Sequence, residues 1–303
     1  MSAPAQRVGA PRVEAPKITG RDAVARAKDL AFRLLLLLCL ALAMLMLGVL
    51  VVDVVRDGAP VISWSFLTSF PSFIPERAGL VSALTGTLWL MGVCAAFVVP
   101  VGIATAVYLE EYADKRRWWN RLIEVNVQNL AAVPSIVYGI LGLGLLVRGP
   151  LSLGRSVLAG ALTLGLLVLP VVIIAGREAI RAVPPSIREG SLALGATQWQ
   201  TLWKQVLPAA IPGMATGVIL ALSRAIGETA PLILVGAATY VAYNPTGLFS
   251  GFTALPLQIY DWVSRPQPEF QVLAAGGIIV LLVLLMIMNG VAITLRNRYE
   301  RKW

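Results

Sequence analysis

The chain has 303 residues, of which 57% are hydrophobic and 14% are charged, and its formal net charge is +9. This composition is too apolar for a soluble domain and predicts a membrane protein. The basic residues lie in short runs between long apolar stretches, which favours orientation in a membrane over nucleic-acid binding. The chain has no histidine, which excludes imidazole metal sites and Ser-His or Cys-His nucleophile pairs.

The two cysteines and the glycine pattern limit the chemistry further. Cys39 and Cys94 lie in apolar runs without metal-ligand spacing, so we expect buried thiols. The dipeptide Gly-Lys is absent, and a P-loop therefore cannot form in this chain. We expect no catalytic activity and no cofactor in the chain itself, and any nucleotide chemistry must come from a partner.

The chain begins with a basic segment, residues 1–33, which carries seven Lys or Arg residues. It predicts a basic N-terminal arm. The following apolar run, Leu34–Val52, is too long for the apolar region of a signal peptide, so we interpret it as a retained first transmembrane helix.

Five further largely apolar runs have about 20 residues or more, which is enough to cross ~30 Å of hydrocarbon. The six predicted spans are Leu34–Val52, Val81–Leu109, Leu122–Val147, Val157–Ala175, Ala210–Tyr240 and Val272–Leu295. The prediction is therefore an all-α polytopic membrane protein with one six-helix domain, residues 34–303, and both termini on the same side.

The connections between these runs predict the orientation. Those on one side carry 19 Lys or Arg residues and those on the other side carry five, which predicts that both termini are cytoplasmic. Aromatic residues recur in the external connections, where they favour either interfacial anchoring or docking of an extracytoplasmic partner. They are Trp64, Phe66, Phe70, Phe73, Tyr240, Tyr243, Phe249, Tyr260 and Trp262.

The longest cytoplasmic loop, residues 176–209, has a composition unusual for a simple connection. Ser186 is expected to cap one short helix, Gly195 permits a sharp turn, and Thr197 is expected to cap a second helix that ends at Pro208. Such a helical hairpin suits either a groove in another protein or, with Trp199 and Trp203, a position flat on the membrane.

The spacing in this loop resembles the EAA loop of ABC importer permeases, whose pattern is Glu-Ala-Ala, three residues, Gly, nine residues and Ile-x-Leu-Pro. Four positions match: Glu189, Gly195, Leu207 and Pro208. Gly190 and Ser191 replace the alanines and remain small, whereas Gln205 replaces the isoleucine, whose contact Val206 is expected to supply. The resemblance implies that this loop docks on an ATP-binding cassette subunit, which holds ATP and Mg.

Two further segments are similar to permeases of phosphate-specific ABC importers of the PstA type. They are Asn129–Ile140, read as NLAAVPSIVYGI, and Leu222–Leu232, read as LSRAIGETAPL. The resemblance implies a type I importer permease in the bacterial inner membrane. It also implies as partners a dimer of ATPase subunits, a second permease of the PstC type and an extracytoplasmic phosphate-binding protein.

Arg224 and Glu228 lie four residues apart in the predicted fifth span, close enough to interact along a helix. Charged residues inside a membrane are expected to face protein or water. One interpretation is a salt bridge that joins two helices. The other is a pathway for phosphate, in which the guanidinium binds the oxyanion and Glu228 weakens that binding. In the similar permeases the corresponding pair is associated with transport.

The predicted function is therefore the membrane permease of an ATP-driven phosphate importer that works by alternating access. Two alternatives are an importer permease for another oxyanion (molybdate, sulfate or phosphonate) and an ion-coupled carrier. The carrier would need coupling residues within its spans, where Arg224 and Glu228 are almost the only candidates.

Overall fold

The computed structural model describes residues 23–114, 116–237 and 240–299, and every regular element in these ranges is helical. The chain divides into two compact units, residues 1–53 and 54–303. By length and composition, five helices of the described chain can cross a membrane, or six if one bent helix pair is counted as a single span. The predicted all-α polytopic fold is confirmed.

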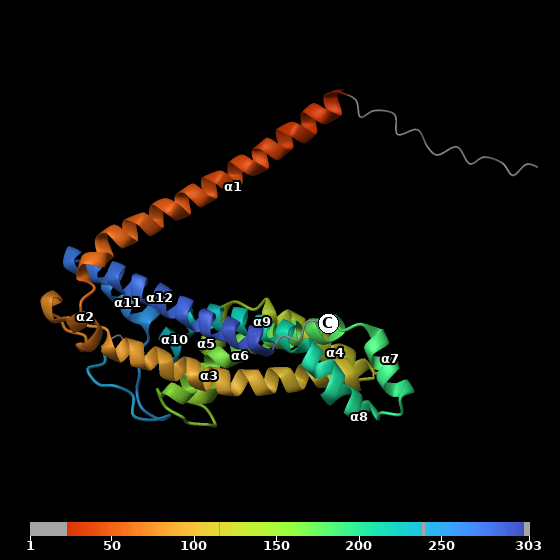
Figure 1. The fold of residues 1–303 in the computed structure, drawn as a ribbon. Helices are drawn as coiled ribbons and strands as arrows, with labels where there is room; N and C mark the ends of the chain where they lie inside the picture. Colours follow the sequence, from red (N-terminus) through yellow and green to blue (C-terminus); the bar gives the residue numbers. More distant parts are fainter. Residues whose placement is uncertain (1–22, 115, 238–239, 300–303) are drawn as a thin grey trace, which may run out of the picture. The chain divides into compact units, whose positions relative to one another are not determined.

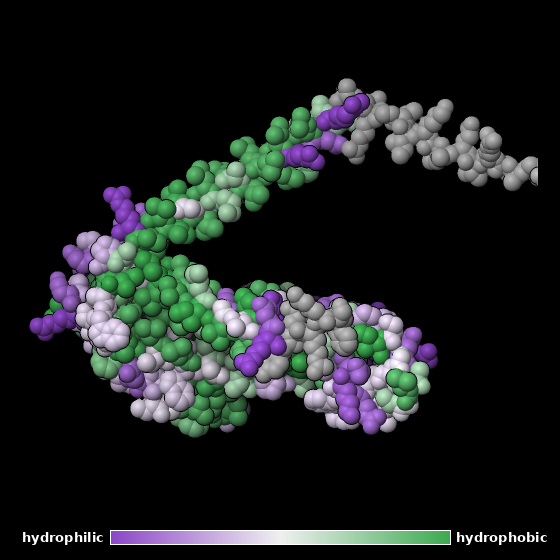
Figure 2. Space-filling model, in the orientation of Figure 1, coloured by the Kyte–Doolittle hydropathy of each residue, from purple (hydrophilic) through white to green (hydrophobic). Residues whose placement is uncertain are grey.

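The first unit consists of most of helix α1, Ala23–Gly58, which contains the predicted first span. Figure 2 shows its long apolar surface, with hydrophilic residues toward its N-terminal end. An uncharged apolar surface of this length is what a lipid-facing helix requires. Cys39 is exposed on this helix, so the prediction that both thiols are buried is correct for Cys94 only. Residues 1–22 of the predicted basic arm lie outside the described residues.

The second unit contains the other helices (Figure 1). The α-helices are α2 Trp64–Thr68, α3 Val81–Val107, α4 Trp118–Ala131, α5 Ser135–Leu141, α6 Val157–Arg181, α7 Pro185–Ala193, α8 Gln198–Thr201, α9 Leu207–Ile226, α10 Ala230–Val235, α11 Leu255–Val263 and α12 Pro268–Tyr299. The 3-10 helices are η1 Ala59–Val61 and η2 Pro75–Arg77, and the π-helices are η3 Tyr108–Tyr112, η4 Gly142–Val147 and η5 Leu202–Val206.

The predicted third span, Leu122–Val147, is not one continuous helix. Its two halves, α4 and α5 with η4, meet at an angle of 109°. The break precedes Pro134, because proline disfavours the helical conformation of the residue before it. The Tyr138 hydroxyl donates a hydrogen bond of 2.8 Å to the Leu130 carbonyl, which satisfies a backbone group near the break.

The predicted fifth span, Ala210–Tyr240, is wrong at both ends. The continuous helix starts at Gln198 and stops at Ile226, and α10 follows a break of three residues. Pro208 does not end a helix as expected. Proline clashes with the carbonyl four residues earlier, here that of Lys204, and the wider turn of η5 around Lys204 accommodates it.

Helices α3, α6 and α9 form the centre of the second unit, around buried side chains such as Val98, Leu164 and Ala221. Small residues allow α6 and α9 to approach closely. A Cβ atom added to Gly213 would lie 2.8 Å from the Ala179 Cβ, and one added to Gly217 would collide with Ala175.

Substitution of Gly217 by leucine is therefore expected to destabilise the chain by about 1–3 kcal/mol, because α6 and α9 must separate to admit the side chain. Thermal unfolding of the purified protein in detergent measures the effect. Gly290→Leu is the matched control, since a Cβ there meets nothing within 4 Å. Equal melting temperatures for both variants would contradict the close packing at Gly217.

The connections predicted to share a side of the membrane contact one another. On one side, Phe66 packs 5.9 Å from Trp262 and Phe73 stacks 4.7 Å from Tyr240, measured between ring centroids. On the other, Arg188 lies 2.8 Å from Glu111. In Figure 1, α2 and α11 lie at one end of the second unit and α7 and α8 at the other. Phe66 and Trp262 are buried, so neither is an interfacial anchor within the external loops.

Candidate functional site

The loop between the fourth and fifth spans forms a helical hairpin, residues 185–206, which we call the coupling hairpin. Helix α7 begins at Pro185, directly after Pro184. Ser186 was expected to cap this helix, but no side chain makes a capping hydrogen bond there. The turn that follows has Gly195 in the left-handed conformation, with φ of 82°. This conformation explains the glycine, because other residues adopt it at a cost.

Thr197 caps the second arm of the coupling hairpin, as predicted. Its hydroxyl oxygen accepts a hydrogen bond of 3.2 Å from the Gln200 amide, and the Gln200 side chain accepts one of 3.0 Å from the Thr197 amide. These reciprocal bonds form a capping box, which fixes where the helix begins. From this cap the helix runs without interruption to Ile226. The second arm and α9 therefore form one continuous helix.

The four residues of the EAA pattern differ in exposure, and two of them lie directly after the coupling hairpin, at its base. Glu189 and Gly195 are exposed, and a Cβ added to Gly195 would meet nothing within 4 Å. Leu207 is buried at the base and Pro208 follows it in the first turn of α9. The pattern thus combines an exposed tip with an anchored base.

The base of the coupling hairpin packs on the membrane domain through a cluster of buried apolar residues. The cluster contains Ala106, Ile180, Val183, Leu202, Val206, Leu207, Ala210 and Met214. Val206 is almost fully buried, so it supplies the packing expected of the isoleucine that Gln205 replaces. A cavity of about 280 Å³ remains beside this cluster, between α6, α7 and α9.

The tip of the coupling hairpin exposes large apolar side chains. Leu194 is 90% exposed, and Leu192, Trp199 and Trp203 are also exposed. The two tryptophan rings lie 5.3 Å apart and form one apolar surface. A patch of this kind next to small and polar residues is typical of a surface that binds another protein or a membrane interface.

Arg224 and Glu228 lie close together, as predicted. The prediction that both lie on one continuous helix is wrong. Glu228 lies in the break after Ile226, and the Arg224 Nε donates a hydrogen bond of 3.3 Å to Glu228 Oε1. The Arg224 side chain is 49% exposed, whereas that of Glu228 is 18% exposed. The geometry leaves much of the guanidinium free for a further partner.

The break beside Glu228 lies next to the other broken span. Helix α10, which follows Glu228, packs on α5, which follows Pro134. A Cβ added to Gly139 on α5 would lie 2.7 Å from the Pro231 Cα, so the glycine permits this approach. Broken helices within a membrane are tolerated where they are buried in protein or line an aqueous cavity, and such breaks often form transport sites.

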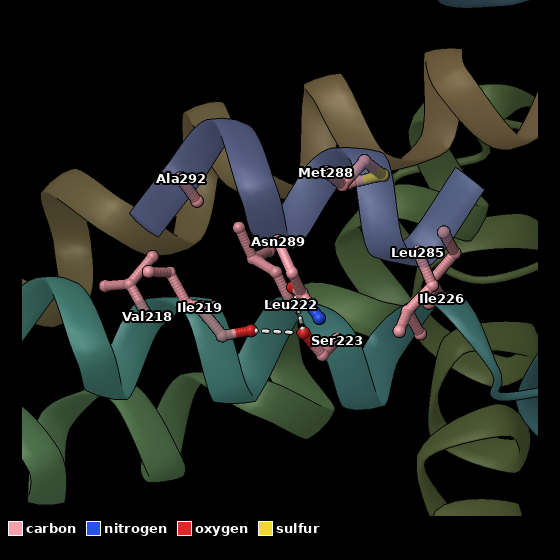
Figure 3. A pocket seen from close by; sticks show the side chains of 9 residues that line it. All are labelled: Val218, Ile219, Leu222, Ser223, Ile226, Leu285, Met288, Asn289 and Ala292. Atoms are coloured by element: carbon pink, nitrogen blue, oxygen red, sulfur yellow. Dashed lines mark hydrogen bonds between the residues drawn. The ribbon is translucent and has the colours of Figure 1, made fainter. Parts of the chain in front are cut away.

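One cavity among the described residues lies near the charged pair in sequence but does not include it. It has a volume of about 120 Å³ and lies between α9 and α12 (Figure 3). The Ser223 Oγ lies 2.6 Å from the Asn289 Oδ1 within it. Because Arg224 and Glu228 are not among its lining residues, we interpret it as a packing gap with a polar contact between two helices.

A cluster of charged residues at the base of the coupling hairpin was missed by the sequence analysis. We call it the ionic cluster. It contains Glu110, Glu111, Glu124, Arg177, Glu178, Arg181 and Arg188. Only the position of acidic and basic residues at the ends of neighbouring apolar runs hints at it. Its arginines were counted for orientation, but their pairing with the glutamates was not predicted.

Sequence comparison assigns the chain to a family. Residues 98–301 match the family model described as binding-protein-dependent transport system inner membrane component. Several phosphate transport system permease proteins are similar. PstA 1 of Mycobacterium tuberculosis is 38% identical over 231 residues, covering 75% of this chain and 74% of that protein. PstA of Xylella fastidiosa is 33% identical over 247 residues, covering 80% and 84% respectively.

The fold is that of known importers. A bacterial ABC transporter that imports the acidic polysaccharide alginate contains a chain with a TM-score of 0.62 and 18% identity, which covers 91% of this chain and 98% of that chain. An inward-facing MetNI methionine transporter gives a TM-score of 0.57 at 18% identity, covering 73% and 96%. In this family, ATP is bound by a separate ATPase subunit. The chain belongs to the binding-protein-dependent transport system inner membrane components, and is thus a multi-pass, non-catalytic permease subunit of an ABC importer.

Proposed function

We propose that this permease imports inorganic phosphate. The proposal rests on its 38% identity with a protein named as a phosphate transport system permease, over about three quarters of both chains. The exposed guanidinium of Arg224 supports it, because a guanidinium can give two parallel hydrogen bonds to a tetrahedral oxyanion. Glu228 shares that guanidinium and so limits how tightly the anion is held, which favours its release.

The second part of the proposal is that the coupling hairpin receives the motion of the ATPase. Glu189 on α7 and Gly195 in the turn are exposed, where a partner can reach them, and Leu207 and Pro208 connect the base of the hairpin to α9. A dimer of ATPase subunits would contact this permease and a second permease of the PstC type. Closure of the dimer would then shift the paired permeases between inward and outward opening, which is alternating access.

In this arrangement the end of the second unit that carries α7 and α8 is cytoplasmic, together with both termini of the chain. The excess of Lys and Arg in the connections at that end supports the orientation. A phosphate-binding protein would deliver its anion to the opposite end, where α2 and α11 lie.

Competition for uptake tests the substrate. In cells that depend on this permease for phosphate, uptake of labelled phosphate is expected to fall when unlabelled phosphate or arsenate is added. Excess molybdate or sulfate is expected to leave it unchanged. A permease for another oxyanion is the main alternative. If uptake of labelled molybdate or sulfate were inhibited by the same unlabelled oxyanion but not by unlabelled phosphate, that result would support this alternative and contradict phosphate as substrate.

A further inference from the structure

The ionic cluster joins the coupling hairpin to three helices that precede it in sequence, α3, α4 and α6. Its members lie on η3 at the end of α3, on α4, on α6 and on α7. Arg177 Nη2 lies 2.7 Å from Glu124 Oε1, and Arg177 Nε lies 3.5 Å from Glu110 Oε2. Arg181 Nη2 also lies 3.0 Å from Glu110 Oε2. Two arginines of α6 thus bracket one carboxylate of η3.

This part of the cluster is buried. The side chains of Arg177 and Glu110 are only 6% and 5% exposed. Charges removed from water are stable only while they remain paired, so separating these two groups without rehydrating them is unfavourable. The cytoplasmic ends of α3 and α6 are therefore held together as one block by charge as well as by apolar packing.

Arg188 is the member of the cluster that belongs to the coupling hairpin. Its Nη2 lies 2.8 Å from Glu111 Oε1 and donates a hydrogen bond of 2.9 Å to the Ile180 carbonyl. One guanidinium therefore joins α7 to both η3 and the last turn of α6. The Glu111 side chain is 12% exposed, so the contact lies largely away from water.

The π-helix η3 explains how adjacent glutamates serve different partners. A π-turn changes the direction of successive side chains and occurs often at functional sites. Here Glu110 faces the arginines of α6 and Glu111 faces Arg188 of α7. The end of α3 thereby contacts the fourth span and the coupling hairpin simultaneously.

We propose that Arg188 and Glu111 are positioning residues that make α7 move as one body with the cytoplasmic ends of α3 and α6. This inference rests on the proposed coupling role of the hairpin. The hairpin is then connected to the membrane domain in two ways. Its second arm moves α9 through a continuous helix, and its first arm moves the α3–α6 block through the Arg188–Glu111 pair.

Transport measurements on the whole complex test the pair. Arg188→Gln and Glu111→Gln are each expected to leave the ATPase bound and hydrolysing ATP, but to lower labelled phosphate imported per ATP about tenfold, the change for loss of one charge-assisted contact. The exchange variant, Arg188→Glu with Glu111→Arg, is expected to restore much of that ratio. Arg121→Gln is the matched control, since this arginine is exposed on α4 and lies outside the Arg188–Glu111 pair.

Wild-type import per ATP in both single variants would overturn the proposal. Failure of the exchange variant to exceed the single variants would also overturn it, because a role that depends on the ion pair is expected to return when the pair is rebuilt with reversed charges. Detergent extraction and pull-down of the ATPase confirm that each variant is assembled before its ratio is taken.

A distance measurement separates this inference from the identity of the substrate. Both native cysteines are first replaced by alanine. Spin labels are then attached to the cysteines of the substitutions Ser186→Cys on α7 and Ala104→Cys on α3. The inference predicts one distance that is unchanged when ATP is trapped in the complex, and a broadened or shifted distance in Arg188→Gln. A distance that changes equally in both proteins would refute it. This result holds even if the complex imports an anion other than phosphate, which would overturn only the proposed substrate.

Discussion

Replacing Arg224 with glutamine is expected to reduce phosphate uptake by about 10- to 100-fold, which corresponds to the loss of one or two charge-assisted hydrogen bonds to the anion. The half-exposed guanidinium has hydrogen-bonding capacity beyond its single contact with Glu228. Glutamine retains most of the length of the side chain but carries neither the charge nor the planar fork. Uptake of labelled phosphate into cells, normalised to the amount of permease in the membrane, measures the effect.

The alternative interpretation of Arg224 is structural, as one half of a salt bridge. Arg224→Lys separates the two interpretations, since lysine retains the charge that pairs with Glu228 but lacks the bidentate geometry. The pathway interpretation expects uptake by the lysine variant to remain well below wild type, although the complex assembles normally. Uptake at the wild-type rate in Arg224→Gln would remove this residue from the pathway. Loss of assembly in both variants would favour the structural role.

Replacing Gly195 with valine is expected to detach the ATPase or to uncouple ATP hydrolysis from uptake. The residue has φ of 82°, and a β-branched side chain in this conformation costs about 1–2 kcal/mol. The turn between α7 and α8 would therefore open, and the exposed tip would lose the shape that a partner contacts. Pull-down of the ATPase and hydrolysis by the purified complex report the two possible outcomes.

Gly195→Asn is the matched control for this turn. Asparagine adopts the left-handed conformation more readily than valine, and the space around Gly195 is open, so the turn itself should persist. We expect asparagine to retain more ATPase binding than valine. If the valine variant binds the ATPase and couples hydrolysis to uptake normally, Gly195 has no role in coupling.

The spans with continuous apolar sequence were predictable, and the broken ones were not. For the fourth span, the predicted Val157–Ala175 corresponds to α6, which extends to Arg181. The run is more polar before Pro134, where Glu124 and several side-chain amides lie, than after it, but nothing local shows that it bends by 109°. The bend depends on packing of α5 against α10, which lies almost a hundred residues later in the chain. Hydropathy reports the length of an apolar run but not its direction.

The same distinction applies to the candidate site. The turn at Gly195 and the cap at Thr197 depend on neighbouring residues, and both were predicted correctly. The ionic cluster depends on residues that are distant in sequence. Glu124 and Arg177 are 53 positions apart, and Glu110 and Arg181 are 71 positions apart. Local patterns therefore identified the tip of the coupling hairpin, whereas only the fold could show what holds its base.

The contact between Arg224 and Glu228 lies between these two cases. Their spacing correctly predicts that they can reach each other, because four residues make about one helical turn. The helix ends between them, however, and the pair owes its geometry to the break at residues 227–229. A carboxylate beside broken backbone and a partly free guanidinium next to it form a more adjustable pair than two residues on a rigid helix.

Transport by the purified complex tests the central claim most directly. The permease is reconstituted into liposomes with its ATPase, its second permease and its binding protein, and accumulation of labelled phosphate is measured with and without ATP. The account predicts accumulation only when ATP, the ATPase and the binding protein are all present, and none with this chain alone. Movement of phosphate through the isolated chain in the absence of ATP would contradict it and would instead support a self-sufficient carrier.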